Sequence, residues 1–229
     1  MGEDFVCAME DILQTYCLPY DEKYPVICLD EMNKNLVEDK REPKAMESGQ
    51  VRKEDYTYEK KGSANLFLAC EPLVGKRYLK VTHQRKKEDF AQFVRYILED
   101  LYPDAEKVIM VLDNLNTHKP SSLYKAFPPQ KARALLNRLE FHYTPKHASW
   151  LNMAEIEFSV LVRQGLQENI ATFEELVQQV EQWEKRRNGV GTVVHWRFTT
   201  SDARIKLSRL YPVLQETDRA AEANVTNLA

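Results

Sequence analysis

Two short apolar runs, each followed directly by an aspartate, constrain the fold of this chain most strongly. Residues 26–29 (VICL) precede Asp30, and residues 108–112 (VIMVL) precede Asp113. Neither run alternates with polar residues, so both are expected to form strands that are covered on both faces of a sheet. In open α/β sheets, reactive groups gather beyond the carboxyl ends of adjacent strands. If these two strands are parallel neighbours, Asp30 and Asp113 lie within a few ångströms of each other.

The segments around these runs predict the remaining elements. Residues 33–55 are polar and charged without periodicity, and are expected to form a loop. A turn signal at Gly62-Ser63 and another near Gly75 separate three further strand-like runs, which predict an antiparallel meander at residues 55–60, 64–70 and 77–82. Helical periodicity appears in residues 5–16, 87–101, 119–139 (with a break at a Pro-Pro pair) and 172–188, and Gly189 is expected to end the last helix. The predicted fold class is α/β, a mixed sheet with a three-strand antiparallel wing plus parallel strands, flanked by helices.

A third acid comes from the segment FHYTPKHASWLNMAEIEF, residues 141–158. Its helical part places Glu155 in the middle of an apolar stripe at i, i+4, i+7 and i+11, formed with Leu151, Phe158 and Val162. On the same helix Glu157 is expected to point well away from the stripe. A carboxylate on an inward face is unfavourable unless it is paired, hydrogen-bonded or bound to a metal.

Asp30, Asp113 and Glu155 are therefore expected to share one site. Three like charges at close range cannot all stay ionised without cations. Oxygen ligands with few imidazoles favour Mg²⁺ or Mn²⁺ over zinc. Two such ions, about 3.5–4 Å apart, can clamp the attacking and leaving oxygens of a phosphodiester. Glu31 and Glu157, as sequence neighbours of these acids, are expected to face elsewhere.

Composition argues against several other classes of protein. The chain has 229 residues of which 43% are hydrophobic, enough for a sizeable core, but no apolar run approaches the roughly 18–20 residues that span a bilayer. The four cysteines lack CxxC spacing and are expected to be reduced thiols, and the N-terminus lacks the basic region of a secretory signal. A net charge of −3 does not by itself indicate a nucleic-acid partner, although lysines and arginines cluster in several short runs.

Four stretches carry a resemblance to a known family: VICLDE, VLDNLNTHKP, FHYTPKHASWLNMAEIEFSVL and HWRFTTSDARIKLSRLYP. They resemble the catalytic core of bacterial insertion-sequence transposases, in the mariner-related branch called IS-six-thirty, across residues 5–212. The resemblance implies a ribonuclease H-like fold and an Asp-Asp-Glu triad, both catalytic and metal-binding, that falls on Asp30, Asp113 and Glu155. It also implies two Mg²⁺ or Mn²⁺ ions, which activate water to nick the transposon ends. The freed 3′-hydroxyl would then attack target DNA, typically at a TA step.

Supporting residues are expected beside the triad, namely Asn114, His118, Lys146, His147 and Asn152. The first two follow Asp113 and would orient it or touch phosphate, although capping or packing beside Pro120 is an equal alternative for His118. The other three flank the Glu155 helix and are expected to contact the DNA strand. Trp150 is expected in the core.

Residues 1–22 are expected to form a connector helix from an N-terminal DNA-binding domain that this chain lacks, residues 23–212 the catalytic domain and residues 213–229 a frayed tail. The expected partner is double-stranded DNA, bound as a homodimer or larger assembly, in the bacterial cytoplasm near the nucleoid and without a membrane. The spacing of 41 residues between Asp113 and Glu155 is longer than the mariner type. Two alternatives stay open: a plain metal-dependent nuclease or resolvase of the same fold, and a truncated or inactive derivative that acts as a binding or dimerising module.

Overall fold

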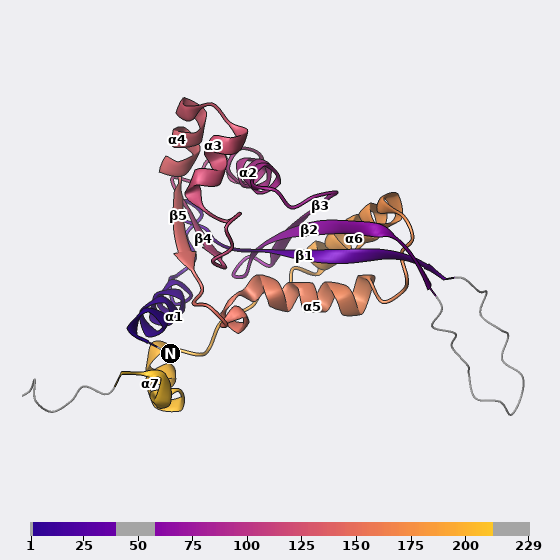
Figure 1. The fold of residues 1–229 in the computed structure, drawn as a ribbon. Helices are drawn as coiled ribbons and strands as arrows, with labels where there is room; N and C mark the ends of the chain where they lie inside the picture. Colours follow the sequence, from indigo (N-terminus) through magenta and orange to yellow (C-terminus); the bar gives the residue numbers. More distant parts are fainter. Residues whose placement is uncertain (1, 40–57, 213–229) are drawn as a thin grey trace, which may run out of the picture.

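One five-stranded sheet organises the chain, in the order β3-β2-β1-β4-β5 (Figure 1). The computed structural model describes residues 2–39 and 58–212. The strands are β1 (Val26–Asp39), β2 (Tyr58–Glu71), β3 (Lys76–Thr82), β4 (Val108–Leu112) and β5 (Leu139–Tyr143). Strands β1, β2 and β3 pair antiparallel, whereas β4 runs parallel to both β1 and β5. This sheet confirms a three-strand antiparallel wing beside parallel strands, but β1 is its third member, because β2 combines the two strands predicted at residues 55–60 and 64–70.

Helices cover both faces of the sheet (Figure 1). One face packs against α2 (Lys87–Tyr96), α3 (Leu123–Ala126) and α4 (Pro129–Asn137), and the other against α1 (Glu3–Thr15), α5 (Met153–Gly165) and α6 (Phe173–Val190). Shorter elements complete the chain: η1 (Ile97–Leu101), η2 (Pro120–Ser122), η3 (Ser149–Leu151), α7 (Thr200–Lys206) and η4 (Ser208–Leu210). The helical layers explain why the strand cores are apolar on both sides.

The strand period of two decides which way consecutive acids on β1 point. Ile27 and Leu29 belong to the core under α2, while Cys28 belongs to the core under α5. Asp30 therefore faces the α5 side and Glu31 faces the α2 side. Two adjacent acids thus serve opposite layers of the molecule.

Strand β1 is longer than the sequence predicts. It continues beyond Asp30 to Asp39, paired with β2 as far as Tyr58, so the predicted loop is wrong for residues 33–39, and residues 40–57 lie outside the described part. The predicted turn at Gly62-Ser63 is also wrong, because β2 runs unbroken through it with a register shift opposite Leu36 and Val37. Within this segment Leu36 is buried in the core, Lys61 pairs with Glu38 at 2.7 Å, and the remaining polar residues are held mainly by strand pairing, which leaves no apolar signature in the sequence.

The helices occur where periodicity places them, with small shifts. Thr172 Oγ1 accepts the backbone N–H of Glu175 at 3.2 Å and starts α6 as predicted. The helix passes Gly189 and ends at Gly191, whose φ of 61° is the left-handed conformation that glycine adopts most readily. Within the described residues, none of the helices has the length and apolar character needed to cross a membrane.

Candidate active site

Asp30 and Asp113 lie at the same level of two adjacent parallel strands. Cys28 of β1 is opposite Val111 of β4, and each aspartate follows two residues later. The predicted adjacency of the two strands is therefore confirmed. Asp30 lies within β1, where β4 ends beside it, and is only 8% exposed, whereas the side chain of Asp113 is 34% exposed. The pair thus combines a buried acid with one that solvent can reach.

Asn152 brings the start of α5 to the same place. Its Oδ1 accepts the backbone N–H of Ala154 at 3.1 Å and so caps the helix, and its Nδ2 donates to the carbonyl of Leu29 at 3.0 Å. Since Leu29 precedes Asp30, this bond ties the first turn of α5, with Glu155, to the aspartate. Asn152 is 1% exposed, so the predicted DNA contact is wrong and its role is to position α5.

The charges of Asp113 and Glu155 both act on Asp30. Burial is the main cause that raises the pKa of Asp30, to about 7; the backbone N–H of Glu31 opposes it, and the charges of Asp113 and Glu155 raise it further. We call Asp30, Asp113 and Glu155 the carboxylate cluster. Its oxygen donors and its negative charge, which His118 compensates only in part, suit a hard divalent cation. Across the described residues, however, no three His, Cys, Asp or Glu side chains are drawn together tightly enough to form a closed metal-binding group.

The predicted helix face of α5 is wrong. The buried residues of the helix include Ala154, Glu157, Phe158 and Leu161, while Glu155 is half-buried and Val162 is 38% exposed. The true stripe is therefore rotated by about one residue from the predicted one, and the acid inside it is Glu157. Glu155 lies at the margin of the stripe, and its negative charge contributes to the raised pKa of Asp30.

Glu157 is neutralised inside the core. Its Oε1 accepts Arg77 Nη2 at 2.7 Å and Arg187 Nη2 at 3.1 Å, and Oε2 accepts Arg187 Nε at 3.2 Å. Burial opposes the charged form, but the hydrogen bonds from the two arginines outweigh it and lower the pKa of Glu157. We call Glu157, Arg77 and Arg187 the buried ion-pair network. It joins α5, β3 and α6.

His118 bonds directly to Asp113, which is one of the two contacts expected for it. Its Nδ1 lies 2.5 Å from Asp113 Oδ1, and the imidazole is fully buried. Burial acts to lower the pKa of His118, but the hydrogen bond to Asp113 and the nearby negative charge of Glu31 prevail and raise it to about 9. Asn114 instead bonds to the carbonyl of Thr144 at 3.4 Å and ties the loop after β4 to the end of β5.

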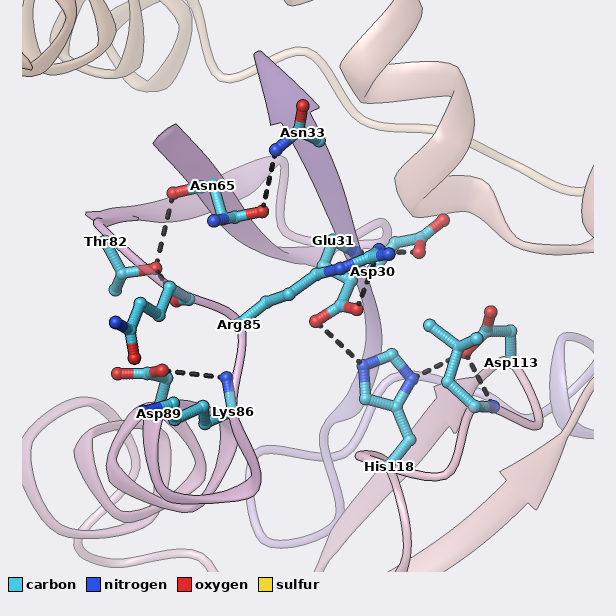
Figure 2. Close-up of polar contacts among 12 residues, drawn as sticks. Asp30, Glu31, Asn33, Asn65, Thr82, Arg85, Lys86, Asp89, Asp113 and His118 are labelled. Carbon is cyan, nitrogen blue, oxygen red and sulfur yellow. Dashed lines mark hydrogen bonds and ion pairs between the residues drawn. The ribbon is translucent and has the colours of Figure 1, made fainter. Parts of the chain in front are cut away.

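Glu31 is a neighbour of the site that sequence reasoning left out. Its side chain is 2% exposed, with Oε2 3.7 Å from His118 Nε2 and Oε1 3.4 Å from Arg85 Nη1 (Figure 2). Glu31 does face away from Asp30, as predicted, but that opposite face is where His118 lies. Two consecutive acids in a buried strand, combined with the strand period of two, indicate that the second acid is buried in the opposite layer.

The loop before α5 is exposed beside the cluster. Lys146 and His147 are both exposed, and His147 has a φ of 64°, an uncommon conformation for a residue with a side chain. Trp150 is 45% exposed, so its predicted core position is wrong; its ring meets Phe198 edge-on with centroids 6.1 Å apart. This loop therefore presents a cation, an imidazole and an aromatic face to solvent, five to nine residues before Glu155 in the sequence.

Comparison with known proteins agrees with this geometry. The family model described as DDE superfamily endonuclease matches residues 25–177, which include the whole carboxylate cluster. The chain therefore belongs to the DDE superfamily endonucleases. Among curated proteins, no sequence matches it.

Solved transposase structures share the fold. A structure described as the Mos1 transposase paired-end complex with left transposon end is 14% identical, with a TM-score of 0.55, over 81% of this chain and 56% of the solved chain. Another, the mariner Mos1 paired end complex with Mg, is 14% identical with a TM-score of 0.56 over 93% and 65% of the two chains. At this identity the likeness establishes the ribonuclease H-like fold alone. This chain spans less than two thirds of the length of those proteins.

Proposed function

We propose that this chain is the catalytic part of a transposase of the IS-six-thirty, mariner-related type from a bacterial insertion sequence. It cleaves DNA at the ends of its element and joins the freed 3′-hydroxyl to target DNA. One observation carries the proposal: Asp30 and Asp113 occupy equal positions on adjacent parallel strands, and Glu155 is close enough to add to the rise in the pKa of Asp30. Membership of the DDE superfamily endonucleases supports the same reading.

The carboxylate cluster would hold two Mg²⁺ or Mn²⁺ ions. When bound, such ions supply Lewis acidity toward a phosphodiester and a water of lowered pKa. A pKa of about 7 for Asp30 means that this acid carries only part of its charge at neutral pH, and added positive charge would favour its ionised form. The Mos1 paired end complex with Mg and a second Mos1 complex with Mn share this fold, which supports the choice of ions.

The DNA partner follows from the same relatives and from the exposed loop before α5. The structures that share the fold are described as transposon paired-end and strand-transfer complexes. In this chain Lys146 and His147 would meet the phosphate backbone near Glu155, and Trp150 offers a face on which a base can stack. We propose double-stranded DNA with a TA-type target, bound by two or more copies of the chain.

The test uses the purified chain with Mn²⁺ and DNA fragments that carry the borders of the coding locus. Wild type should nick at the element border and join that end to a second duplex. Asp30→Asn, Asp113→Asn and Glu155→Gln should each reduce nicking by roughly a thousandfold or more, because loss of several kcal/mol of transition-state stabilisation has that effect. Gel analysis of labelled ends gives both products.

Asp39→Asn is the matched control, since Asp39 is an exposed acid on the same strand as Asp30. Its nicking rate should stay within about twofold of wild type, the range expected for a surface substitution. Cleavage of any duplex without joining would indicate a plain nuclease of the same fold. Binding to the borders with no cleavage, or inhibition of an active transposase by mixed assembly, would indicate a binding module.

A further inference from the structure

A buried histidine lies between two acids next to the carboxylate cluster. His118 Nδ1 is 2.5 Å from Asp113 Oδ1, and on the opposite edge of the ring Nε2 is 3.7 Å from Glu31 Oε2 (Figure 2). The imidazole and Glu31 are 0% and 2% exposed. The three side chains come from β1 and from the loop after β4, so the arrangement links the two strands that carry the aspartates.

The histidine is fixed on every side. The ring of His118 packs on Phe90 of α2, with ring centroids 4.9 Å apart. The backbone of His118 is held as well: its carbonyl accepts a hydrogen bond from the hydroxyl of Tyr143 at 2.9 Å, and its backbone N–H donates to the carbonyl of Leu115 at 3.0 Å. A ring that is fixed in this way can fix the position of the group to which it is hydrogen-bonded. Its hydrogen-bonded partner is a single oxygen of Asp113.

All hydrogen bonds that the described residues give the Asp113 carboxylate fall on Oδ1. The backbone N–H of Leu115 donates to it at 3.3 Å, in addition to His118. The aspartate side chain is nevertheless 34% exposed. One oxygen is therefore pinned by the protein, while the group as a whole remains accessible.

Glu31 completes the arrangement from the other side. Glu31 Oε2 and His118 Nε2 are both buried without a hydrogen-bond partner in the described structure, and they face each other as acceptor and donor. Shortening their separation by about 0.5 Å would form a normal hydrogen bond. Arg85 Nη1, 3.4 Å from Oε1, holds the other end of the glutamate.

We propose that His118, held by Glu31, is the positioning residue for Asp113: it fixes Oδ1 so that Oδ2 is presented to a divalent cation. The inference rests on the proposed function, because it takes Asp113 as a metal ligand. Groups that orient a ligand in this way commonly change metal affinity by 10–100-fold when they are removed. A purely structural ion pair would instead alter the stability of the fold and leave the affinity of the folded protein unchanged.

Two substitutions at one position separate these roles. In His118→Asn the side-chain amide lies where Nδ1 was and can still donate to Asp113, whereas in His118→Gln it lies where Nε2 was. The measurement is Mn²⁺ affinity of the DNA-free chain, from the electron paramagnetic resonance signal of free Mn²⁺. We expect His118→Gln to weaken the affinity by about tenfold and His118→Asn by no more than about threefold.

His142→Gln is the matched control. His142 also lies between two acids, 2.7 Å from Asp11 and 3.2 Å from Glu140, but it is on the partly exposed edge formed by α1 and β5. Its Mn²⁺ affinity should equal that of wild type. If His118→Asn and His118→Gln weaken binding equally, or neither weakens it, the positioning role is refuted.

Two further variants keep the result interpretable. Should both His118 variants fail to fold, Glu31→Gln, which keeps the shape of the side chain, should still weaken Mn²⁺ binding about threefold or more, and unchanged binding would refute the proposal. Asp113→Asn tests the proposed function itself. If it binds Mn²⁺ as tightly as wild type does, the metal site is refuted; if it alone loses binding, only the positioning role fails.

Discussion

Two carboxylates on the same helix, Glu155 and Glu157, belong to regions with opposite electrostatics. Glu157 is 2% exposed and bonded to Arg77 and Arg187, so its charge is balanced inside the protein. Glu155 is half-buried, and the charge that it shares with Asp30 and Asp113 is repulsive. The balanced charge joins three elements of the fold, and the unbalanced charges favour an external cation. Burial alone does not distinguish them; the sign of the neighbouring charges does.

Glu157→Gln should produce the largest effect on stability. It leaves the guanidinium of Arg77, 1% exposed, without its ionic partner, and breaking a buried pair typically removes about 3–5 kcal/mol of the free energy of unfolding. For a chain of this size the melting temperature should fall by about 10 °C in thermal unfolding followed by circular dichroism. Because helical periodicity in the sequence puts Glu157 away from the predicted apolar stripe, a loss of stability at this position is not expected from the sequence alone.

Glu155→Gln is the control on the same helix, and should shift the free energy of unfolding by less than about 0.5 kcal/mol. In the double variant Arg77→Met with Glu157→Leu, most of the lost stability should return, because apolar groups of similar volume replace the pair. A Glu157→Gln protein that melts like wild type but does not nick DNA would break the comparison and place Glu157 in the reactive set.

Asp30→Asn should have the opposite effect in metal-free buffer. The pKa of Asp30 in the fold is about 7, above its ordinary value of 3.8, so ionisation destabilises the folded state increasingly as pH rises between these values. Removing the charge should raise the free energy of unfolding by about 2–4 kcal/mol at pH 8 and by well under 1 kcal/mol at pH 4. Urea unfolding with EDTA at the two pH values measures the difference. Asp39→Asn should show no such pH dependence, and a destabilised Asp30→Asn protein would contradict the proposed repulsion.

The carboxylate cluster was accessible to sequence reasoning because its determinants are local. An unbroken apolar run such as 108–112 identifies a strand covered on both faces, and the acid that follows it must lie at the strand's end. The adjacency of Asp30 and Asp113 then depends only on the two strands being parallel neighbours, as the structure has them. The polar continuation of β1 beyond Asp30 carries no such signal.

The buried ion-pair network was not accessible in the same way. Arg77 is 80 residues from Glu157, and neither residue has a local pattern that names the other. The helix phase failed as well, since Val162 and Ala154 are both apolar and only the packing of α5 shows which of them faces the core. Counting Val162 as inward moved the predicted stripe onto Glu155. Glu31 was overlooked for a related reason, because the position of His118 depends on a loop fold rather than on strand periodicity.

The smallest expected effect is stabilisation of the fold by Mn²⁺, which should depend on the carboxylate cluster and not on the buried ion-pair network. Mn²⁺ at ten times its dissociation constant should stabilise the wild-type fold by about 1.4 kcal/mol, which corresponds to a rise of about 3–6 °C in the melting temperature. The Asp113→Asn protein should show little of this rise, because its cluster has lost a charged ligand. The Arg77→Met, Glu157→Leu protein should show all of it, since its carboxylate cluster is intact, and chelation with EDTA should reverse the shift. Equal stabilisation of all three proteins would mean that Mn²⁺ binds elsewhere, and the unbalanced charges of Asp30, Asp113 and Glu155 would then need a different explanation.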